Sequence, residues 1–169
     1  MGETTLNLDP PLRACWMKIG QQKRIPATRP GAKHHRHVFG VYEWLEDEVT
    51  WTIAEKKNSE IFIAFLEEWL VKKYPTGRVT LVLDNASYHK SGSALAALSL
   101  FEHRLMTIWL PPNCSDLNPI ERFWRHLKDL ACASKLEDNI ENVVKATEKI
   151  LNEQNNPDSD LRFRISKNL

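Results

Sequence analysis

The sequence predicts an α/β domain built on a mixed sheet with helices on its faces. Two stretches rich in Val, Tyr, Trp and Ile flank a short acidic turn, which is typical of an antiparallel hairpin. Two continuous aliphatic runs follow, and a stretch with helical spacing separates them. Such runs suit strands covered on both faces, and a strand–helix–strand unit implies a parallel pair. A hairpin added to that pair gives a mixed sheet.

Each expected strand has bounds that follow from its residue pattern. The hairpin strands are expected at His37 to Trp44 and Glu48 to Glu55, and the buried strands at Val79 to Leu83 and Arg104 to Leu110. Two prolines stop the last of these, because proline lacks the N–H that a strand ladder needs. A short strand is also expected at Arg13 to Lys18, in a basic and Pro-rich start that gives little other signal.

Apolar residues recur at helical spacing in four stretches. The predicted helices are Ser59 to Lys73, Ser91 to Glu102, a third that begins at Asn118-Pro119, and Asn139 to Asn152. Asn118 is a good N-cap, and Pro119 is a good first helical residue. We expect the core-facing positions to include Leu95 in the second helix and Trp124 and Leu130 in the third.

The length and composition are those of one globular domain. Its 169 residues are taken as a single unit, residues 1–169, with a polar and then basic tail at residues 155–169. No apolar run approaches the ~20 residues of a membrane span, and the start carries no visible secretory signal. The three cysteines are scattered without a CxxC pair, so we expect reduced thiols of a cytosolic protein rather than a zinc site.

Charge is unevenly distributed along the chain, although the net charge is only +1. The stretch from Pro10 to Tyr42 contains no Asp or Glu and is rich in basic residues and histidine. A block of one sign suits a polyanion such as DNA, and the alternative is a solvated basic loop balanced elsewhere in the fold. The residues concerned are Arg13, Lys18, Lys23, Arg24, Arg29, Lys33 and Arg36, with His34, His35 and His37.

Two acidic residues are candidates for chemistry, and each also has a structural explanation. Asp84 follows a buried strand, at the sheet edge where α/β proteins bind ligands, but an Asx-turn closing the strand is the more frequent explanation of a lone Asp in this place. Glu121 lies in the first turn of the third helix, where it can form a capping box with Asn118. It also lies beside the buried stripe, so it can face the sheet rather than water.

Taken together, the two carboxylates indicate a metal site. Both follow adjacent strand ends within one strand–helix–strand–helix unit, so both can reach the same sheet edge. Hard divalent cations such as Mg²⁺ prefer carboxylate oxygens, and converging carboxylates can hold two metals ~3.5–4 Å apart for phosphodiester chemistry.

Two segments carry a resemblance to a known family. LVLDNASYH (81–89) and LPPNCSDLNPIERFWRHLK (110–128) closely resemble the second and third catalytic blocks of bacterial insertion-sequence transposases of the mariner-like superfamily. Asp84 matches the family's second Asp and Glu121 its third acidic residue, with 36 residues between them. Asn85, His89 and Asn118 match residues that shape the site. The upstream stretch and the hairpin also fit, so the resemblance covers nearly the whole chain.

The resemblance implies a fold, an activity and partners. The fold is ribonuclease-H-like, and the activity is DNA strand cleavage and strand transfer at element ends with Mg²⁺ or Mn²⁺ held by Asp84 and Glu121. The partners are the transposon ends, the target DNA and a second copy in an active homodimer, with no membrane. The setting is the cytoplasm of a bacterium, at the nucleoid. The basic residues between Arg13 and Arg36 are then expected to contact phosphates.

The chain departs from the family pattern at its start. The family's first block ends in an Asp-Glu pair; Glu3 aligns with the Glu, and Gly2 stands where the catalytic Asp belongs. We therefore expect a domain that lacks its first strand. It is either a fragment of a longer transposase reading frame or an inactive remnant that keeps DNA binding. A stand-alone nuclease of the same fold is another alternative, and Asp9 is a weak substitute for the missing ligand. Unpaired strand edges are expected to promote oligomerisation or poor solubility.

Overall fold

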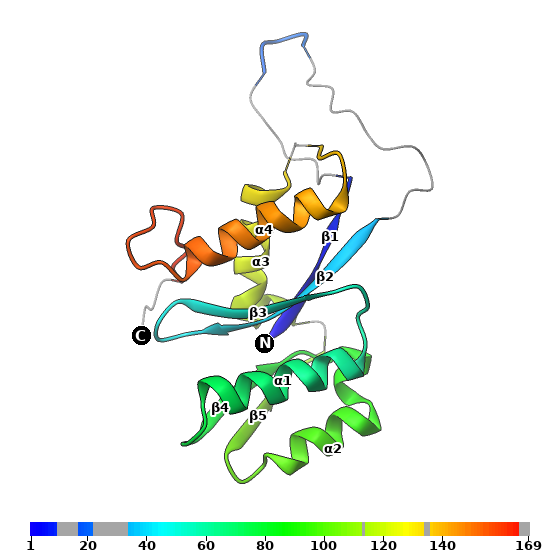
Figure 1. Cartoon of the computed structure of the whole chain (residues 1–169), viewed down its shortest axis with the longest axis vertical. Coiled ribbons are helices and arrows are strands. Elements are labelled where there is room, and N and C mark those ends of the chain that lie inside the picture. The colour runs from blue at the N-terminus through cyan, green and yellow to red at the C-terminus, as the bar shows by residue number, and fades with distance from the viewer. Residues whose placement is uncertain (10–16, 22–33, 113, 134–135, 166–169) are drawn as a thin grey trace.

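The computed structural model describes residues 1–9, 17–21, 34–112, 114–133 and 136–165. Within these residues the strands form two sheets, one antiparallel with the order β1-β2-β3 and one parallel with the order β4-β5. Four α-helices surround them, with α3 and α4 on one side of the antiparallel sheet and α1, α2 and the parallel sheet on the other (Figure 1). The predicted α/β architecture is therefore confirmed.

The antiparallel sheet contains the predicted hairpin and one strand that the residue pattern did not predict. β2 (His35–Glu43) pairs with β3 (Glu48–Ala54), as expected. β1 (Gly2–Asn7) lies against the other edge of β2, with Gly2 opposite Gly40. The strand expected at 13–18 falls mostly outside the described residues, and its last two positions do not form a strand.

The parallel pair is also as predicted. β4 (Val79–Leu83) pairs with β5 (Leu105–Trp109) in parallel, and α2 (Gly92–Leu100) connects them after a short 3₁₀ helix, η1 (Ser87–Lys90). One hydrogen bond, from the Met1 amino group to the Val82 carbonyl oxygen at 2.9 Å, links this sheet to β1.

Side-chain caps fix where three helices begin. Asn58 Oδ1 accepts a hydrogen bond from Ile61 N–H at the start of α1 (Ser59–Lys73), and Asn139 does the same for α4 (Ile140–Gln154). Ser91 caps α2. Such bonds satisfy backbone donors that have no partner within the helix, which explains why these boundaries agree closely with the predicted ones.

The two sides of the antiparallel sheet carry separate apolar cores. Side chains of α1, α2, β4 and β5 pack on one side, and those of α3 (Pro119–Ala131) and α4 pack on the other. Trp124, at 1 % exposure, belongs to the second core, as expected. The core positions predicted at Leu95 and Leu130 are wrong: these side chains are 46 % and 42 % exposed, because each lies at the edge of its helix's apolar stripe.

A glycine on β2 permits the close approach of α3. A Cβ at Gly40 would lie 2.7 and 2.9 Å from Trp124 ring carbons, well inside van der Waals contact. Without that Cβ, the indole can approach the strand closely. Because Glu121 is three residues before Trp124 on the same helix, this contact also fixes the depth at which Glu121 enters the molecule.

The segment after α4 packs on the body of the protein as far as the structure describes it. Asn155 bonds the N–H and the C=O of Val49 through its side-chain amide, at 2.8 and 2.9 Å. Gln154 bonds both the N–H and the C=O of Phe163. In the described part of the chain, no helix is both long and apolar enough to cross a membrane.

Candidate active site

Three carboxyl groups, those of Glu3, Asp84 and Glu121, lie where the two sheets meet. Asp84 directly follows β4, Glu121 lies in the first turn of α3, and Glu3 lies on β1. The negative charges of Glu3 and Asp84 both act on Glu121, after burial, to raise its pKa. The sheet edge predicted from Asp84 and Glu121 therefore brings both together, with Glu3 as a third member.

Asp84 is held by two hydrogen bonds. Its Oδ1 lies 2.9 Å from His89 Nδ1 and accepts a second bond from Ala86 N–H at 3.0 Å. The bond from Ala86 N–H forms the Asx-turn that was the alternative explanation for an Asp at this position. The bond with His89 is the larger cause of the lowered pKa of Asp84, so this carboxyl group stays ionised to lower pH than an ordinary one.

His89 is a fully buried side chain between two carboxylates. It has 0 % exposure, and its ring stacks obliquely on Phe62 at 4.5 Å between centroids. Its Nδ1 lies 2.9 Å from Asp84 Oδ1, and its Nε2 lies 3.8 Å from Glu3 Oε2. The ring therefore holds Asp84 in place and separates it from Glu3.

Glu121 is presented by the start of α3. Asn118 is the N-cap and Pro119 follows it in the first turn, as predicted, but the Asn118 side chain does not cap the helix. Its Nδ2 instead donates to the Met1 carbonyl oxygen at 2.9 Å, in a buried bond that joins α3 to the beginning of β1. Asn118 thus fixes the position of the helix that carries Glu121.

Gly2 faces Glu121 directly. A Cβ at this residue would point at α3, 3.4 Å from Glu121 Oε1, 3.5 Å from Asn118 Nδ2 and 2.8 Å from Ile120 Cγ2. A side chain at residue 2 would therefore project into the space beside Glu121. The position that the sequence assigns to a missing carboxylate is thus at the site, and Ile120 would have to shift to admit one.

Glu3 and Lys57 form an ion pair that the residue pattern did not predict. Lys57 Nζ lies 2.7 Å from Glu3 Oε1 and 5.5 Å from the centre of the Tyr88 ring. The Glu3 side chain is 5 % exposed, and among the described residues its Oε2 has no hydrogen-bond partner. The resemblance to the family's Asp-Glu pair indicated that Glu3 belongs to the site. No pattern in the sequence predicted its contact with Lys57, because 53 residues lie between the two.

Other predicted site residues lie further from this cluster. Asn85 donates to the Leu110 carbonyl oxygen and ties the end of β4 to the end of β5. Asp9 follows the far end of β1, and a strand from Gly2 to Asn7 spans ~16 Å. This distance excludes Asp9 as a replacement ligand beside Glu121.

Most of the predicted DNA-binding segment lies outside the described residues. Arg13, Lys23, Arg24 and Lys33 all fall there, whereas Lys18 is described and exposed. Arg36 on β2 forms ion pairs with Glu141 at 2.9 Å and Glu55 at 3.4 Å, so part of its charge is neutralised within the protein.

The donor atoms suit a hard divalent cation but do not complete a three-carboxylate site. Asp84 and Glu121 supply oxygens. Burial, and after it the negative charges of Glu3 and Asp84, raise the pKa of Glu121, and a cation would offset the effect of those charges. Among the described residues, however, no group of three or more His, Cys, Asp or Glu side chains has the arrangement of a metal site.

The mixed α/β architecture, with acidic residues at the ends of strands, agrees with the family that comparison with known proteins identifies. The chain matches the DDE superfamily endonuclease family over residues 1–143, and it belongs to that family. It is 28 % identical over 127 residues, 75 % of its length, to the insertion element IS630 uncharacterized 39 kDa protein of Shigella sonnei.

Solved structures give the fold. The chain is similar to Mos1 transposase in a paired-end complex with the left transposon end (TM-score 0.70, 16 % identity, 95 % of this chain). It is also similar to the Mos1 strand transfer complex (TM-score 0.67, 16 % identity, 89 % of this chain). These matches confirm the ribonuclease-H-like fold and the resemblance to insertion-sequence and mariner transposases. The chain spans 36 % of the insertion-element protein and 48 % of the Mos1 chain.

Proposed function

We propose that this chain is the catalytic domain of an insertion-sequence transposase, which cleaves and transfers DNA strands at element ends with the help of a divalent metal. The observation that carries the proposal is the convergence of Asp84 and Glu121 at one sheet edge, where their charges interact. The family match and the solved complex of Mos1 transposase with its left transposon end support DNA as the substrate. A homodimer acting on two ends is part of the same proposal.

The residues of the chain have distinct tasks in this reaction. His89 keeps Asp84 ionised and oriented, and Asn118 fixes the helix that presents Glu121. Together the two carboxylates would hold Mg²⁺ or Mn²⁺, and such an ion would supply Lewis-acid activation of the nucleophile and stabilisation of the leaving group. Lys57, 38 % exposed at the rim of the cluster, is placed to attract a phosphate.

A second function is favoured by Gly2. Because residue 2 faces Glu121 without a side chain, the site has one carboxylate fewer than the family pattern. In this alternative the chain keeps its fold and its affinity for DNA but does not turn over. Exposed basic residues such as Lys18 would then be the functional ones.

A plasmid-nicking assay in Mn²⁺ separates these candidates without knowledge of the terminal sequence. The unmodified chain is compared with Asp84→Asn, Gly2→Asp and the neutral, similarly sized Gly2→Asn. If the unmodified chain nicks the plasmid and Asp84→Asn abolishes nicking, the result supports the enzyme. The nicking rate should then increase further in Gly2→Asp but not in Gly2→Asn. If the unmodified chain does not nick the plasmid but Gly2→Asp does, the result supports the inactive remnant.

Two further readouts complete the test. DNA binding by fluorescence anisotropy should persist in every variant, because none of the three changes touches a basic residue. Joining of a pre-cleaved 3′-hydroxyl end to the plasmid distinguishes a transposase from a nuclease that only hydrolyses. If neither the unmodified chain nor Gly2→Asp nicks DNA, the proposed catalytic site is wrong.

A further inference from the structure

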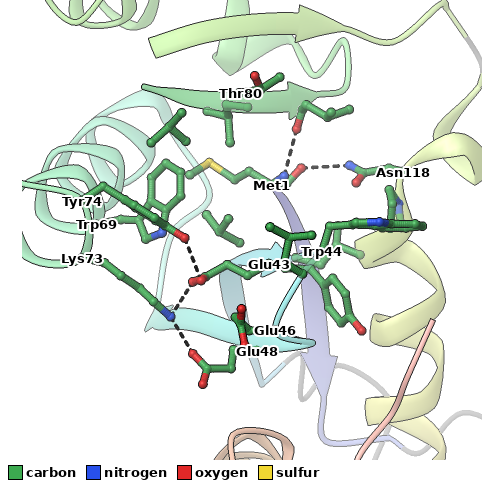
Figure 2. A pocket seen from close by; sticks show the side chains of 18 residues that line it. Met1, Glu43, Trp44, Glu46, Glu48, Trp69, Lys73, Tyr74, Thr80 and Asn118 are labelled. Atoms are coloured by element: carbon green, nitrogen blue, oxygen red, sulfur yellow. Dashed lines mark hydrogen bonds and ion pairs between the residues drawn. The ribbon is translucent and has the colours of Figure 1, made fainter. Parts of the chain in front are cut away.

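The two ends of β2 carry different groups of titratable side chains. At the β2–β3 turn, Lys73 pairs with Glu43 at 2.5 Å and with Glu48 at 2.9 Å (Figure 2). The carboxylates at this end are therefore already held by an ammonium group of the protein. At its other end, β2 begins with two histidines, His35 and His37, which offer nitrogen donors instead.

His35 and His37 lie on the same face of β2. Residues two apart on a strand point to one face, and the centres of these two rings are 5.1 Å apart. The ring planes are inclined at 63°, so the rings do not stack face to face. Two imidazoles that bind one ion through nitrogens at ~2.0–2.1 Å, with a tetrahedral angle between the bonds, have centres roughly 5 Å apart. The pair therefore has the spacing of two ligands of one ion.

The neighbouring residues point to the opposite face. Arg36 lies between the two histidines in the sequence, and its guanidinium group pairs with Glu141 of α4 at 2.9 Å. His34 precedes β2, and its carbonyl oxygen accepts a bond from Leu8 N–H at 3.1 Å, so the strand pairing continues to this residue. Because side chains alternate along a strand, the His34 side chain belongs to the face of Arg36 and not to that of the pair.

A hydroxyl group of β1 orients the His37 ring. Thr5 is opposite His37 in the β1–β2 register, and its Oγ1 lies 3.1 Å from His37 Nδ1. When Nε2 binds an ion, Nδ1 carries the ring proton and donates it to this hydroxyl group. Metal-binding histidines usually have such a partner on the second ring nitrogen, because it fixes the tautomer and the orientation of the ring.

The charges around His37 are compatible with a bound cation. Burial, and after it His35 and Lys57, lower the pKa of His37 below its ordinary value, so the ring is mostly neutral at neutral pH, as a metal ligand must be. Glu3 acts on His37 in the opposite direction from Lys57. Since Glu3 and Lys57 form an ion pair at 2.7 Å, their effects on a cation at the pair oppose each other.

We propose that His35 and His37 form a two-histidine site for a borderline divalent transition metal of the class of Ni²⁺, Cu²⁺ and Zn²⁺. Imidazole nitrogen suits these ions whereas Mg²⁺ prefers oxygen, so the site differs in ligand chemistry from the carboxylates of Asp84 and Glu121. Zinc sites have three or four protein ligands, so at this pair water or another small ligand would complete the coordination. This inference does not depend on the proposed function.

Calorimetric titration of Ni²⁺ into the untagged chain tests the site. Both rings are needed, because the second ring binds an ion that the first already holds nearby. His35→Ala and His37→Ala should therefore each weaken binding by on the order of tenfold or more, and the double variant should add little. His34→Ala is the matched control and should leave the affinity unchanged. Excess Mg²⁺ should not displace Ni²⁺.

Two of the variants separate a lost ligand from a disturbed fold. Thr5→Val keeps both rings and replaces a hydroxyl group with a methyl group, so it should weaken Ni²⁺ binding by about tenfold through the orientation of His37 alone. His35 is exposed, so His35→Ala should leave the free energy of unfolding in urea nearly unchanged. Absence of Ni²⁺ binding, an affinity unaffected by His35→Ala, an equal loss in His34→Ala, or displacement by excess Mg²⁺ would each overturn the proposal.

Discussion

Replacing Gly40 with alanine should destabilise the protein and loosen the site together. The added Cβ would lie 2.7 and 2.9 Å from Trp124 ring carbons and 3.4 Å from the Thr50 carbonyl oxygen. Trp124 is 1 % exposed and cannot swing into solvent, so α3 has to move away from β2. Overpacking of this kind costs ~1–3 kcal/mol, and the displacement should also weaken metal binding, because Glu121 moves with the helix.

Urea unfolding followed by circular dichroism measures the effect, with Gly92→Ala as the matched control. A Cβ at Gly92 meets nothing within 4 Å, so the same chemical change there should be neutral or stabilising by up to ~1 kcal/mol. Equal free energies of unfolding for Gly40→Ala and the unmodified chain would refute the argument that Gly40 sets the distance between α3 and the sheet.

Three other predictions address the site and the surface. His89→Leu removes the hydrogen bond that lowers the pKa of Asp84, whereas His89→Asn can keep it. As pH is lowered, the Leu variant should therefore lose Mn²⁺ binding at a higher pH than the Asn variant does. Arg36→Ala should cost no more than ~1 kcal/mol in urea unfolding, because its ion pairs are solvent-exposed. Asn155→Ala should cost ~1–3 kcal/mol, since it leaves both backbone groups of Val49 without their partner.

The sign of the His89 effect follows from the direction of the shift. The pKa of Asp84 is lowered in the folded protein, so its ionised form contributes stability above the ordinary carboxyl pKa and loses it as pH falls through the lowered value. Loss of the hydrogen bond moves that transition to higher pH. A variant whose binding midpoint and acid unfolding are unchanged would contradict the assigned role of His89.

The regular elements were predictable because local signals and burial agree. α1 has its predicted bounds, Ser59–Lys73, since Asn58 caps its start and Pro75 follows its end. β4 was recognisable from an uninterrupted aliphatic run. β1 was not predicted, because Gly2–Asn7 is short and mixes polar with apolar residues, and only its pairing with β2 makes it a strand.

The candidate site was only partly predictable. Asp84 and Glu121 could be placed at one sheet edge because each follows a strand end. The ion pair of Glu3 with Lys57 depends on how the connection before α1 passes over β1, and no local pattern encodes that approach. The polar segment after α4 gave no signal for its packing, which depends on single side chains such as Asn155 bonding the edge of β3.

Calorimetric titration of Mn²⁺ tests whether Asp84 and Glu121 belong to one metal site. The unmodified chain is compared with Asp84→Ala, Glu121→Ala and the double variant. We expect Mn²⁺ to bind the unmodified chain, each single change to weaken binding and the double variant to lack it. The single effects should not add, because both residues hold the same ion. Absence of binding at millimolar Mn²⁺, or undiminished binding by the double variant, would contradict a shared site.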